Sequence, residues 1–156
     1  FTTEEGFRML LGFLYRFDAE MHTLEIKASD DIPLAALIDT PYEVQCSVGN
    51  PYMLRALNTE EVLKAMRRGD FGRFVIEVAD DFLPDNAGRW LVEPGKAEPT
   101  QLSPDLRMSV QAFSQLVCGY TDLASARFRR DVEILTENPA PARAFAKKPL
   151  YVGYYY

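Results

Sequence analysis

Residues 74–90 read FVIEVADDFLPDNAGRW and contain the clearest strand and turn signals in the chain. The part from residue 71 to residue 79 is rich in β-branched and aromatic side chains, which favour a strand. Residues 85–88, Asp-Asn-Ala-Gly, have turn-forming side chains and lead into a second extended run, residues 89–93. This stretch therefore predicts a β-hairpin.

Helices are predicted where apolar residues recur at spacings of three and four, in several cases next to a capping residue, a glycine or a proline. They cover residues 7–21, 33–38, 58–66, 111–118, 122–128 and 131–138. Further strands are predicted where side chains alternate or β-favouring residues gather. They cover residues 22–28, 52–57, 106–110 and 150–156. Because helices and strands are mixed without strict alternation, the sequence predicts an α+β fold with a mixed, mainly antiparallel sheet and packed helices.

The length of the chain and its turn-rich middle indicate how it is divided. A chain of 156 residues has room for one domain and part of a second. Residues 41–51 contain turn residues and no clear period, so we place a linker or a boundary there. The chain starts at Phe1 without a signal-like segment, and we expect further residues to precede it in the natural polypeptide.

Composition and charge disfavour several classes of function. Lys plus Arg is 17 and Asp plus Glu is 23, a net charge of −6, which makes nucleic acid an unfavourable partner because polyanions are bound by basic patches. The apolar runs are far shorter than the roughly 18 residues that a membrane span needs, so we expect no membrane span. Cys46 and Cys118 lack the spacing of a zinc site or a disulfide scaffold, which favours two buried thiols in a cytoplasmic protein.

Candidate catalytic residues are few. His22 is the only histidine, so a nucleophilic triad would depend on it, and ligands for a catalytic zinc ion are too few; we expect no metal. Asp30–Asp31 and Asp80–Asp81 are paired carboxylates that could serve acid–base chemistry or bind Mg²⁺. Both pairs follow predicted strands and precede proline-containing segments, where aspartates cap turns, so we favour the capping role.

The chain ends in LYVGYYY, residues 150–156, and exposed tyrosines there would present an apolar patch to water. One interpretation is a terminal strand docked on the core, which the residues alone favour. The other is that the tail enters a cleft and brings the α-carboxylate of Tyr156 to a reaction centre.

Five segments resemble the C-terminal half of the Eis-like (enhanced intracellular survival) acetyltransferases, a multidomain GNAT family that ends in a sterol-carrier-protein-like domain. They are residues 7–18, 30–34, 52–58, 74–90 and 108–120, and residues 74–90 match best. Asn58 stands where the family usually has aspartate. The resemblance implies that residues 1–51 are the end of a central GNAT-like domain and that residues 52–156 are the sterol-carrier-protein-like C-terminal domain.

The resemblance also implies an activity for the longer protein. Such enzymes transfer acetyl from acetyl-CoA to an amine, and the carboxylate that ends the chain acts as general base, a role that maps onto Tyr156. The family's pyrophosphate-binding loop lies in its N-terminal domain and has no counterpart here, so we expect no cofactor in this fragment and acetyl-CoA in the parent enzyme. The implied partners are the N-terminal GNAT domains of the same polypeptide, an amine substrate and further copies in a homo-oligomer.

Two other functions stay open at this point. A sterol-carrier fold can enclose an apolar tunnel, so the domain could bind lipid or another hydrophobic ligand. It could also be a purely architectural oligomerisation module. In either case, as in the first, the fragment is expected to be catalytically inactive on its own.

Overall fold

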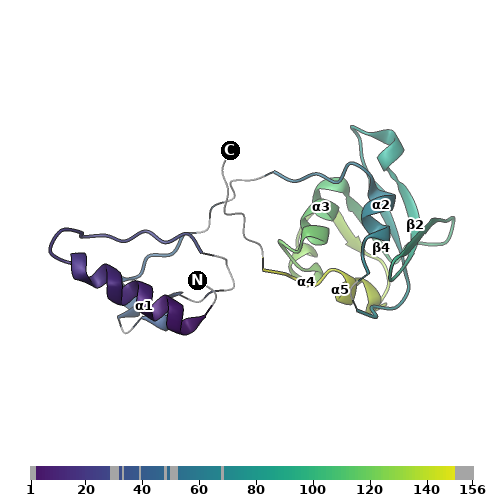
Figure 1. Ribbon diagram of the computed structural model, residues 1–156. Helices are drawn as coiled ribbons and strands as arrows, with labels where there is room; N and C mark the ends of the chain where they lie inside the picture. The colour runs from purple at the N-terminus through teal and green to yellow at the C-terminus, as the bar shows by residue number, and fades with distance from the viewer. Residues whose placement is uncertain are drawn as a thin grey trace.

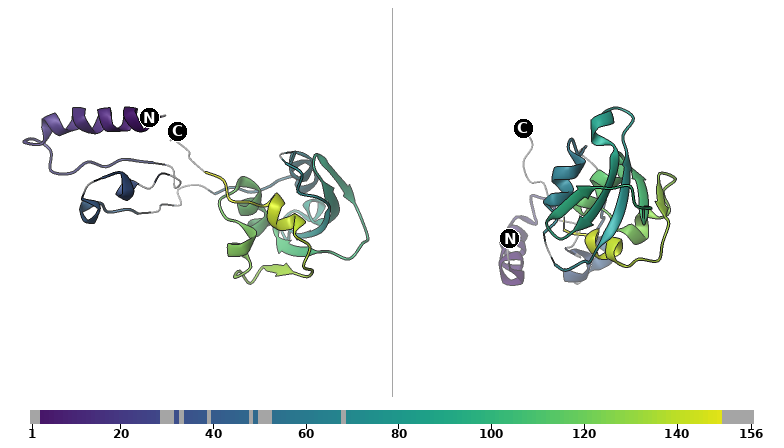
Figure 2. Two further views of the ribbon diagram at one scale, coloured as in Figure 1. Left: turned by 90° about the horizontal axis from the view of Figure 1, so that it is seen from below. Right: turned by 90° about the vertical axis from the view of Figure 1, so that its right-hand side faces the viewer.

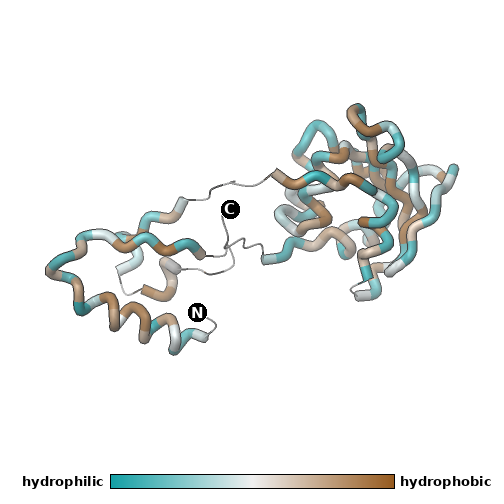
Figure 3. The backbone as a smooth tube through the Cα atoms, turned by 45° about the horizontal axis from the view of Figure 1, so that its top comes forward, coloured by the Kyte–Doolittle hydropathy of each residue, from teal (hydrophilic) through white to brown (hydrophobic). Residues whose placement is uncertain are grey.

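The computed structural model describes residues 3–28, 32, 34–38, 40–47, 49, 53–67 and 69–149. The N-terminal part contains the amphipathic helix α1 (Glu4–Leu14) and the short 3-10 helices η1 (Tyr15–Phe17), η2 (Leu34–Leu37) and η3 (Pro41–Glu43) (Figure 1). Hydrophobic residues run along much of α1 (Figure 3). Phe7 is buried, whereas Met9 and Phe13 are 70% and 56% exposed, so α1 presents an apolar face that is only partly covered.

A five-stranded sheet organises residues 74–134. Its strands are β1 (Phe74–Ala79), β2 (Gly88–Glu93), β3 (Lys96–Pro99), β4 (Leu106–Ser109) and β5 (Val132–Ile134), in the spatial order β3-β2-β1-β4-β5. β1 and β4 pair in parallel, and the other neighbours pair antiparallel. The predicted hairpin is confirmed as the β1–β2 pair, and the sheet is mixed and mainly antiparallel, as the sequence predicts.

Among the described residues, four α-helices accompany the sheet: α2 (Thr59–Lys64), α3 (Val110–Cys118), α4 (Leu123–Ala126) and α5 (Ala140–Ala144). The short 3-10 helix η4 (Pro84–Asn86) lies in the loop between β1 and β2. α2 contacts β2 and β3, and α3 contacts β1 and β4, so the helices and the sheet form two layers (Figure 2). Gly119, in the left-handed conformation at φ +81°, ends α3 as its sequence predicts.

Alternate strand residues and the facing sides of the helices form the core between the two layers. The ring of Phe145 makes edge contacts with Phe74 and Phe113, at centroid distances of 5.9 Å and 6.4 Å. All three rings are at most 1% exposed. Phe145 therefore ties the segment after α5 to both the sheet and α3.

The opposite side of the sheet carries a row of alternating charges across four strands. Glu77 on β1 accepts hydrogen bonds from Arg89 on β2, at 2.6 Å, and from Arg107 on β4, at 3.1 Å. Arg107 also pairs with Glu133 on β5 at 2.9 Å. Burial would raise the pKa of Glu77, but the hydrogen bonds from the two arginines outweigh it and lower that pKa. The row links neighbouring strands by cross-strand ion pairs.

The strands predicted at residues 22–28 and 52–57 are wrong. Neither residues 22–28 nor the described part of the second segment, residues 53–57, forms a strand. A lone extended segment is not stable without a pairing partner. Residues 53–57 are instead held by side chains: Ala56 N donates to Ser114 Oγ, and Ala56 O accepts from Asn86 Nδ2, both at 2.9 Å.

The predicted helix at residues 131–138 is also wrong, since residues 132–134 form β5 and pair with β4. Pairing with Met108 buries Val132 at the edge of the core, which local helical spacing cannot reveal. Strand β3 has no strong signal of its own in Lys-Ala-Glu-Pro and forms through its pairing with β2. The predicted terminal strand at residues 150–156 lies outside the described residues.

Among the described residues, no helix is both long enough and apolar enough to cross a membrane. Both cysteines are free thiols. Cys46 is exposed, so the prediction that it is buried is wrong, and Cys118 is partly buried.

Candidate functional site

Tyr156, the predicted catalytic residue, lies outside the described residues, as do Asp30 and Asp31. Pro149 is the last of the described residues. What the structure does define is the place where the last residues leave the folded domain.

That place is an anchor between Lys148 and the end of α3. Lys148 N donates a hydrogen bond of 3.0 Å to the carbonyl oxygen of Gly119. A Cβ atom on residue 119 would lie 2.6 Å from Cβ of Lys148, closer than real Cβ contacts allow. Glycine is therefore required at position 119 both for the positive φ of the helix end and for the close approach of the outgoing chain.

The best-matching segment of the sequence contains a buried polar network centred on Asp80. Its carboxylate accepts hydrogen bonds from Phe82 N, at 3.0 Å, and from Leu83 N, at 2.9 Å. It also accepts from Asn86 Nδ2, at 2.8 Å, and pairs with Arg55 at 2.5 Å. Every contact fastens the loop between β1 and β2 or ties it to residues 53–57.

Asn86 extends this network to α2. Its Oδ1 accepts from Thr59 N at 2.6 Å and from Thr59 Oγ1 at 2.8 Å, while its Nδ2 donates to Ala56 O. Asn86 and Thr59 are 4% and 1% exposed. Burying polar groups is favourable only when they are hydrogen-bonded, and this side chain uses both its donor and its acceptor atoms.

The surroundings of Asp80 keep its carboxylate ionised. Burial would raise its pKa, but the hydrogen bonds from Asn86, Leu83 and Phe82 and the charge of Arg55 lower the pKa to about 2. A group that holds its charge so firmly and has no access to solvent is poorly suited to move protons. Asp81, beside it, is exposed. The pair does not form a catalytic dyad, and the capping role favoured from the sequence is the one that Asp80 performs.

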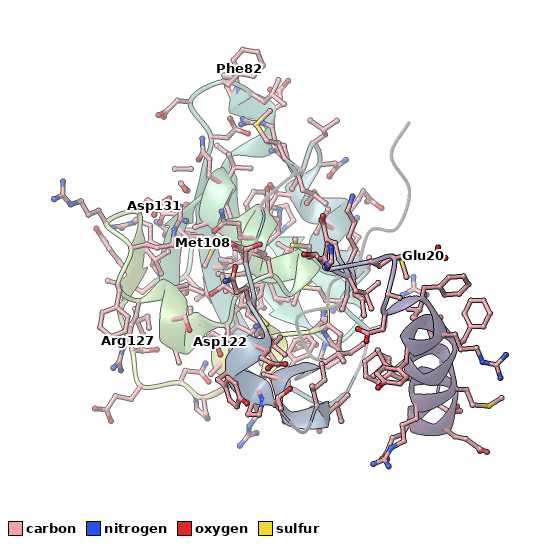
Figure 4. The ribbon with its side chains drawn as sticks, turned by 90° about the vertical axis from the view of Figure 1, so that its left-hand side faces the viewer. Glu20, Phe82, Met108, Asp122, Arg127 and Asp131 are labelled. Carbon is pink, nitrogen blue, oxygen red and sulfur yellow. The ribbon has the colours of Figure 1, made fainter. Side chains whose placement is uncertain are left out.

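Phe82 stands at the tip of the same loop and points away from the domain (Figure 4). Its ring is 80% exposed, and the Arg55 guanidinium lies 5.6 Å from the ring centroid. Arg55 Nε is buried without a hydrogen-bond partner in the part of the chain that the structure describes. No local sequence signal predicts the contacts of Arg55 with Asp80, of Thr59 with Asn86 or of Asn86 with Ala56, because each pair is separated by 25 to 30 residues.

A second ionic group lies at the start of α3. Ser109 caps the helix by accepting from Ala112 N and donates to Asp131, which Arg129 holds at 2.7 Å. The hydrogen bonds from Arg129 lower the pKa of Asp131 to about 2, and the bond from Ser109 adds to this effect against the opposing effect of burial. With no histidine nearby to act as base, Ser109 serves as a cap.

Metal chemistry lacks a supporting cluster in the part of the chain that the structure describes, and two of the helix starts are unsuited to a coenzyme phosphate. His22 is exposed, and among the described residues no group of three or more His, Cys, Asp and Glu side chains is placed to hold a metal ion. The first turns of α1 and α2 each carry two glutamates, which would repel the pyrophosphate of acetyl-CoA. The residues present at these helix starts do not fit that coenzyme.

Two depressions open on the surface of residues 57–101. The larger, about 860 Å³, is broad and open and lies beside Glu77 and Arg89 on the charged side of the sheet. The smaller, about 290 Å³, lies between the start of α2, the loop at residues 83–86 and Trp90. Between sheet and helices the interior is occupied by fully buried side chains such as Phe113, Leu116 and Phe145. This packing is evidence against an apolar tunnel in the described residues.

Comparisons with known proteins agree with the resemblance noted in the sequence. Residues 57–152 match the family model of the sterol carrier protein domain. The structure of Eis1 from Mycobacterium abscessus matches with 28% identity and a TM-score of 0.67, over 77% of this chain and 32% of that one. No protein with curated function matches the sequence.

Two further solved structures share the fold at lower identity. A conserved Enterococcus faecalis protein, described as a probable N-acyltransferase, is 21% identical with a TM-score of 0.69, over 96% of this chain and 40% of that one. A GCN5-related N-acetyltransferase from Anabaena variabilis is 20% identical with a TM-score of 0.51, over 60% of this chain and 26% of that one. This chain thus spans less than half the length of each of these three proteins. Because the family model matches more than half of its residues, the chain belongs to the sterol carrier protein domain family, and its predicted resemblance to Eis-like acetyltransferases is confirmed.

Proposed function

We propose that this chain is the C-terminal portion of an acetyl-CoA-dependent N-acetyltransferase and supplies the carboxylate of Tyr156, with part of the substrate pocket, to an active site in a preceding GNAT domain. The observation that carries the proposal is the match to Eis1 over 77% of this chain but only 32% of Eis1. The two acyltransferase structures that share the fold support it.

The chemistry asked of Tyr156 is proton removal. An amine must lose a proton when its nitrogen forms a bond to the acetyl carbon, and a carboxylate within hydrogen-bonding distance can accept that proton. An α-carboxyl group has a pKa of about 3.5 in water, so it needs desolvation to become an effective base. The apolar and aromatic residues 150–155 would exclude water around it. Acetyl-CoA, bound by the preceding domain, supplies the activated acetyl group.

The anchor at Gly119 limits where that carboxylate can act. Eight residues, 149–156, follow Lys148, and a fully extended chain of that length spans at most about 28 Å. The receiving chamber must therefore lie within roughly 28 Å of Lys148 in the intact enzyme. Because Lys148 is already fixed to the folded domain, only residues 149–156 have to be ordered when the tail enters the chamber. The cost in conformational entropy is limited to those residues.

The division of the chain remains part of the same proposal. Residues 1–51 would complete a central GNAT-like domain, and residues 52–156 would form the C-terminal domain. The exposed apolar side chains of α1, among them Met9 and Phe13, support this division, because such a helix face is normally covered by other parts of its own domain. We further propose assembly into a homo-oligomer and, in view of the two free thiols, a cytoplasmic location.

The decisive experiment uses the parent enzyme. Deleting Tyr156, or extending the chain by several residues beyond it, should lower kcat much more than it weakens acetyl-CoA binding, because the base is displaced while the coenzyme site is intact. Tyr156→Phe is the matched control: it keeps the terminal carboxylate and should retain activity. Full turnover in the deletion variant would refute the base role.

The lipid-carrier alternative receives no support from the interior. The core side chains fill the space between sheet and helices, and the described depressions are open to solvent. The architectural alternative differs from the proposal in one measurable respect: the tail variants would alter the size of the parent assembly rather than its turnover per active site.

A further inference from the structure

The row of charges on the charged side of the sheet is straight, because its members lie opposite one another in the strand register. Glu77 on β1 lies opposite Arg89 on β2 and opposite Arg107 on β4, and Arg107 lies opposite Glu133 on β5. Across the strand order β2-β1-β4-β5 the charges therefore alternate plus, minus, plus, minus. Neighbouring strands are about 4.8 Å apart, so these four residues form a charge row roughly 14 Å long.

A charge row with this order is complementary to itself. Its midpoint lies between β1 and β4. When two sheets are stacked, a two-fold axis that runs between them at this midpoint, parallel to the strands, reverses the row in the second copy. Arg89 then faces Glu133 of the second copy and Glu77 faces Arg107 of the second copy, so each of the four positions meets the opposite charge. A two-fold axis uses the same surface on both copies, which is the commonest arrangement of protein dimers.

The neighbouring row on the same side of the sheet fits the same axis. Leu91 is two residues after Arg89, and Leu135 is two residues after Glu133, so both leucines share the side of the charge row. Leu135 N donates to Asp105 O at 2.8 Å, which continues the pairing of β4 with β5. Leu135 is 46% exposed and Leu91 is half-buried. The axis that matches the charges also brings Leu91 of each copy opposite Leu135 of the other, and this apolar contact favours association.

The two halves of the charge row also differ in relief. On β1 and β2, the side chains of Glu77 and Arg89 are 27% and 30% exposed and border the depression of about 860 Å³. On β4 and β5, the side chains of Arg107 and Glu133 are 44% and 55% exposed. The two-fold axis places the more exposed half of one copy over the recessed half of the other.

We propose that the charged side of this sheet is a homodimer interface, in which two copies of the chain stack about a two-fold axis between β1 and β4. This interface would serve the homo-oligomer proposed above, but it rests on the sheet alone and not on the role of Tyr156. Five strands of at most six residues give a footprint of roughly 20 Å by 20 Å on each copy. Such an area is small for a stable complex, so we expect a Kd on the order of 100 μM at low salt.

Self-association of the 156-residue chain is the first measurement. Sedimentation equilibrium at up to about 1 mM protein should show a monomer–dimer equilibrium, and a rise from about 0.05 M to about 0.5 M salt should weaken it at least about threefold, because salt screens exposed charges. In NMR spectra, dilution should shift the backbone resonances of β1, β2, β4 and β5 and leave those of α1 unchanged. Shifts confined to α1, or a chain that stays monomeric throughout, would overturn the proposal.

Exchange of charge between the two ends of the row tests the axis itself. Glu133→Lys should weaken association at least about tenfold, because its lysine would face Arg89 of the second copy. Arg89→Glu should have a similar effect, because its glutamate would face Glu133 of the second copy. A mixture of the two variants should associate again, since each of the four positions then meets the opposite charge. A defect in the fold of either variant would not be repaired by mixing.

Glu61→Lys is the matched control. Like Glu133, Glu61 is an exposed glutamate in an ion pair, here with Lys64 at 2.9 Å, but it lies on α2, in the other layer. The control makes the same change in net charge and should leave the Kd unaltered. Thermal unfolding checks the fold of each variant, and if Arg89→Glu does not fold, Glu133→Lys and Glu61→Lys decide the question by themselves. Equal Kd values for these two variants would overturn the proposal, as would a mixture that associates no more tightly than either variant alone.

Discussion

Arg55 and Asp80 form an ion pair of 2.5 Å in which the Asp80 side chain is fully buried and the Arg55 side chain is 32% exposed. The pair joins the segment before α2 to the loop between β1 and β2. Such a pair is weak evidence for net stabilisation by itself, but removal of one partner from a buried network is strongly destabilising. The network is therefore a structural device that shapes the loop rather than a catalytic one.

Asn86→Ala should be among the most harmful single substitutions in this loop. It removes the acceptor of Thr59 N and a donor to both Ala56 O and Asp80, leaving buried polar groups without partners. We expect a loss of about 2–4 kcal/mol in the free energy of unfolding, measured by urea titration.

The matched control for that change is Asn58→Ala, which removes an exposed helix cap that accepts from Glu61 N. Its expected cost is about 1 kcal/mol. If Asn86→Ala destabilises the chain no more than this control does, the buried network does not hold the loop.

Acid should destabilise the fold over a defined pH range. Asp80 and Asp131 each have a pKa of about 2 in the folded chain, below the ordinary value of 3.8. Between these values the unfolded chain binds more protons, so stability falls as pH drops from about 4 to about 2. Urea midpoints measured from pH 5 to pH 2 should show this decline. Asp131→Asn should be less stable at pH 5 but should show a shallower dependence; an equally steep curve would contradict the assignment of that pKa.

Gly119→Ala should weaken the anchor between Lys148 and the end of α3, which fixes the start of the C-terminal tail. The backbone at residue 119 is left-handed, with φ +81°, a conformation that alanine disfavours, and the added methyl group would lie 2.6 Å from Cβ of Lys148. We expect a cost of about 2–3 kcal/mol in thermal or urea unfolding. In the parent enzyme the same change should lower kcat, since the position of the carboxylate depends on the anchor.

Gly69→Ala separates the cost of the left-handed backbone from the cost of the contact with Lys148. Residue 69 has a similar φ of +76° but open space around its Cβ position, so it carries the backbone cost alone, about 1 kcal/mol. Equal destabilisation by both substitutions would mean that the contact with Lys148 adds nothing.

Acetyl-CoA should not bind to this chain alone. The helix starts at α1 and α2 are acidic, and the resemblance places the coenzyme site in another domain. Calorimetric titration should give no heat beyond dilution, whereas the parent enzyme should bind acetyl-CoA under the same conditions. Micromolar binding to the 156-residue chain would overturn the proposed division of labour.

Local chemistry was sufficient to predict much of this protein. The run at residues 71–79, the turn at residues 85–88 and the glycine after α3 each contain their own signal, so the hairpin, α3 and the α+β class follow from the sequence. The spacing of apolar residues likewise predicts α1 and α2. The helix predicted at residues 7–21 is too long, however, because α1 ends at Leu14 and only the 3-10 helix η1 follows it, to Phe17.

Tertiary structure alone decided the parts that depend on distant partners. Residues 132–134 become a strand because β4 offers an edge, and residues 53–57 stay irregular because Ser114 and Asn86 take their backbone hydrogen bonds. The ion pair of Asp80 with Arg55 and the anchor between Gly119 and Lys148 have no local pattern, because each joins residues separated by more than twenty positions. Sequence spacing records which neighbours a residue has along the chain, whereas burial and hydrogen bonding depend on which groups the folded chain brings within a few ångströms.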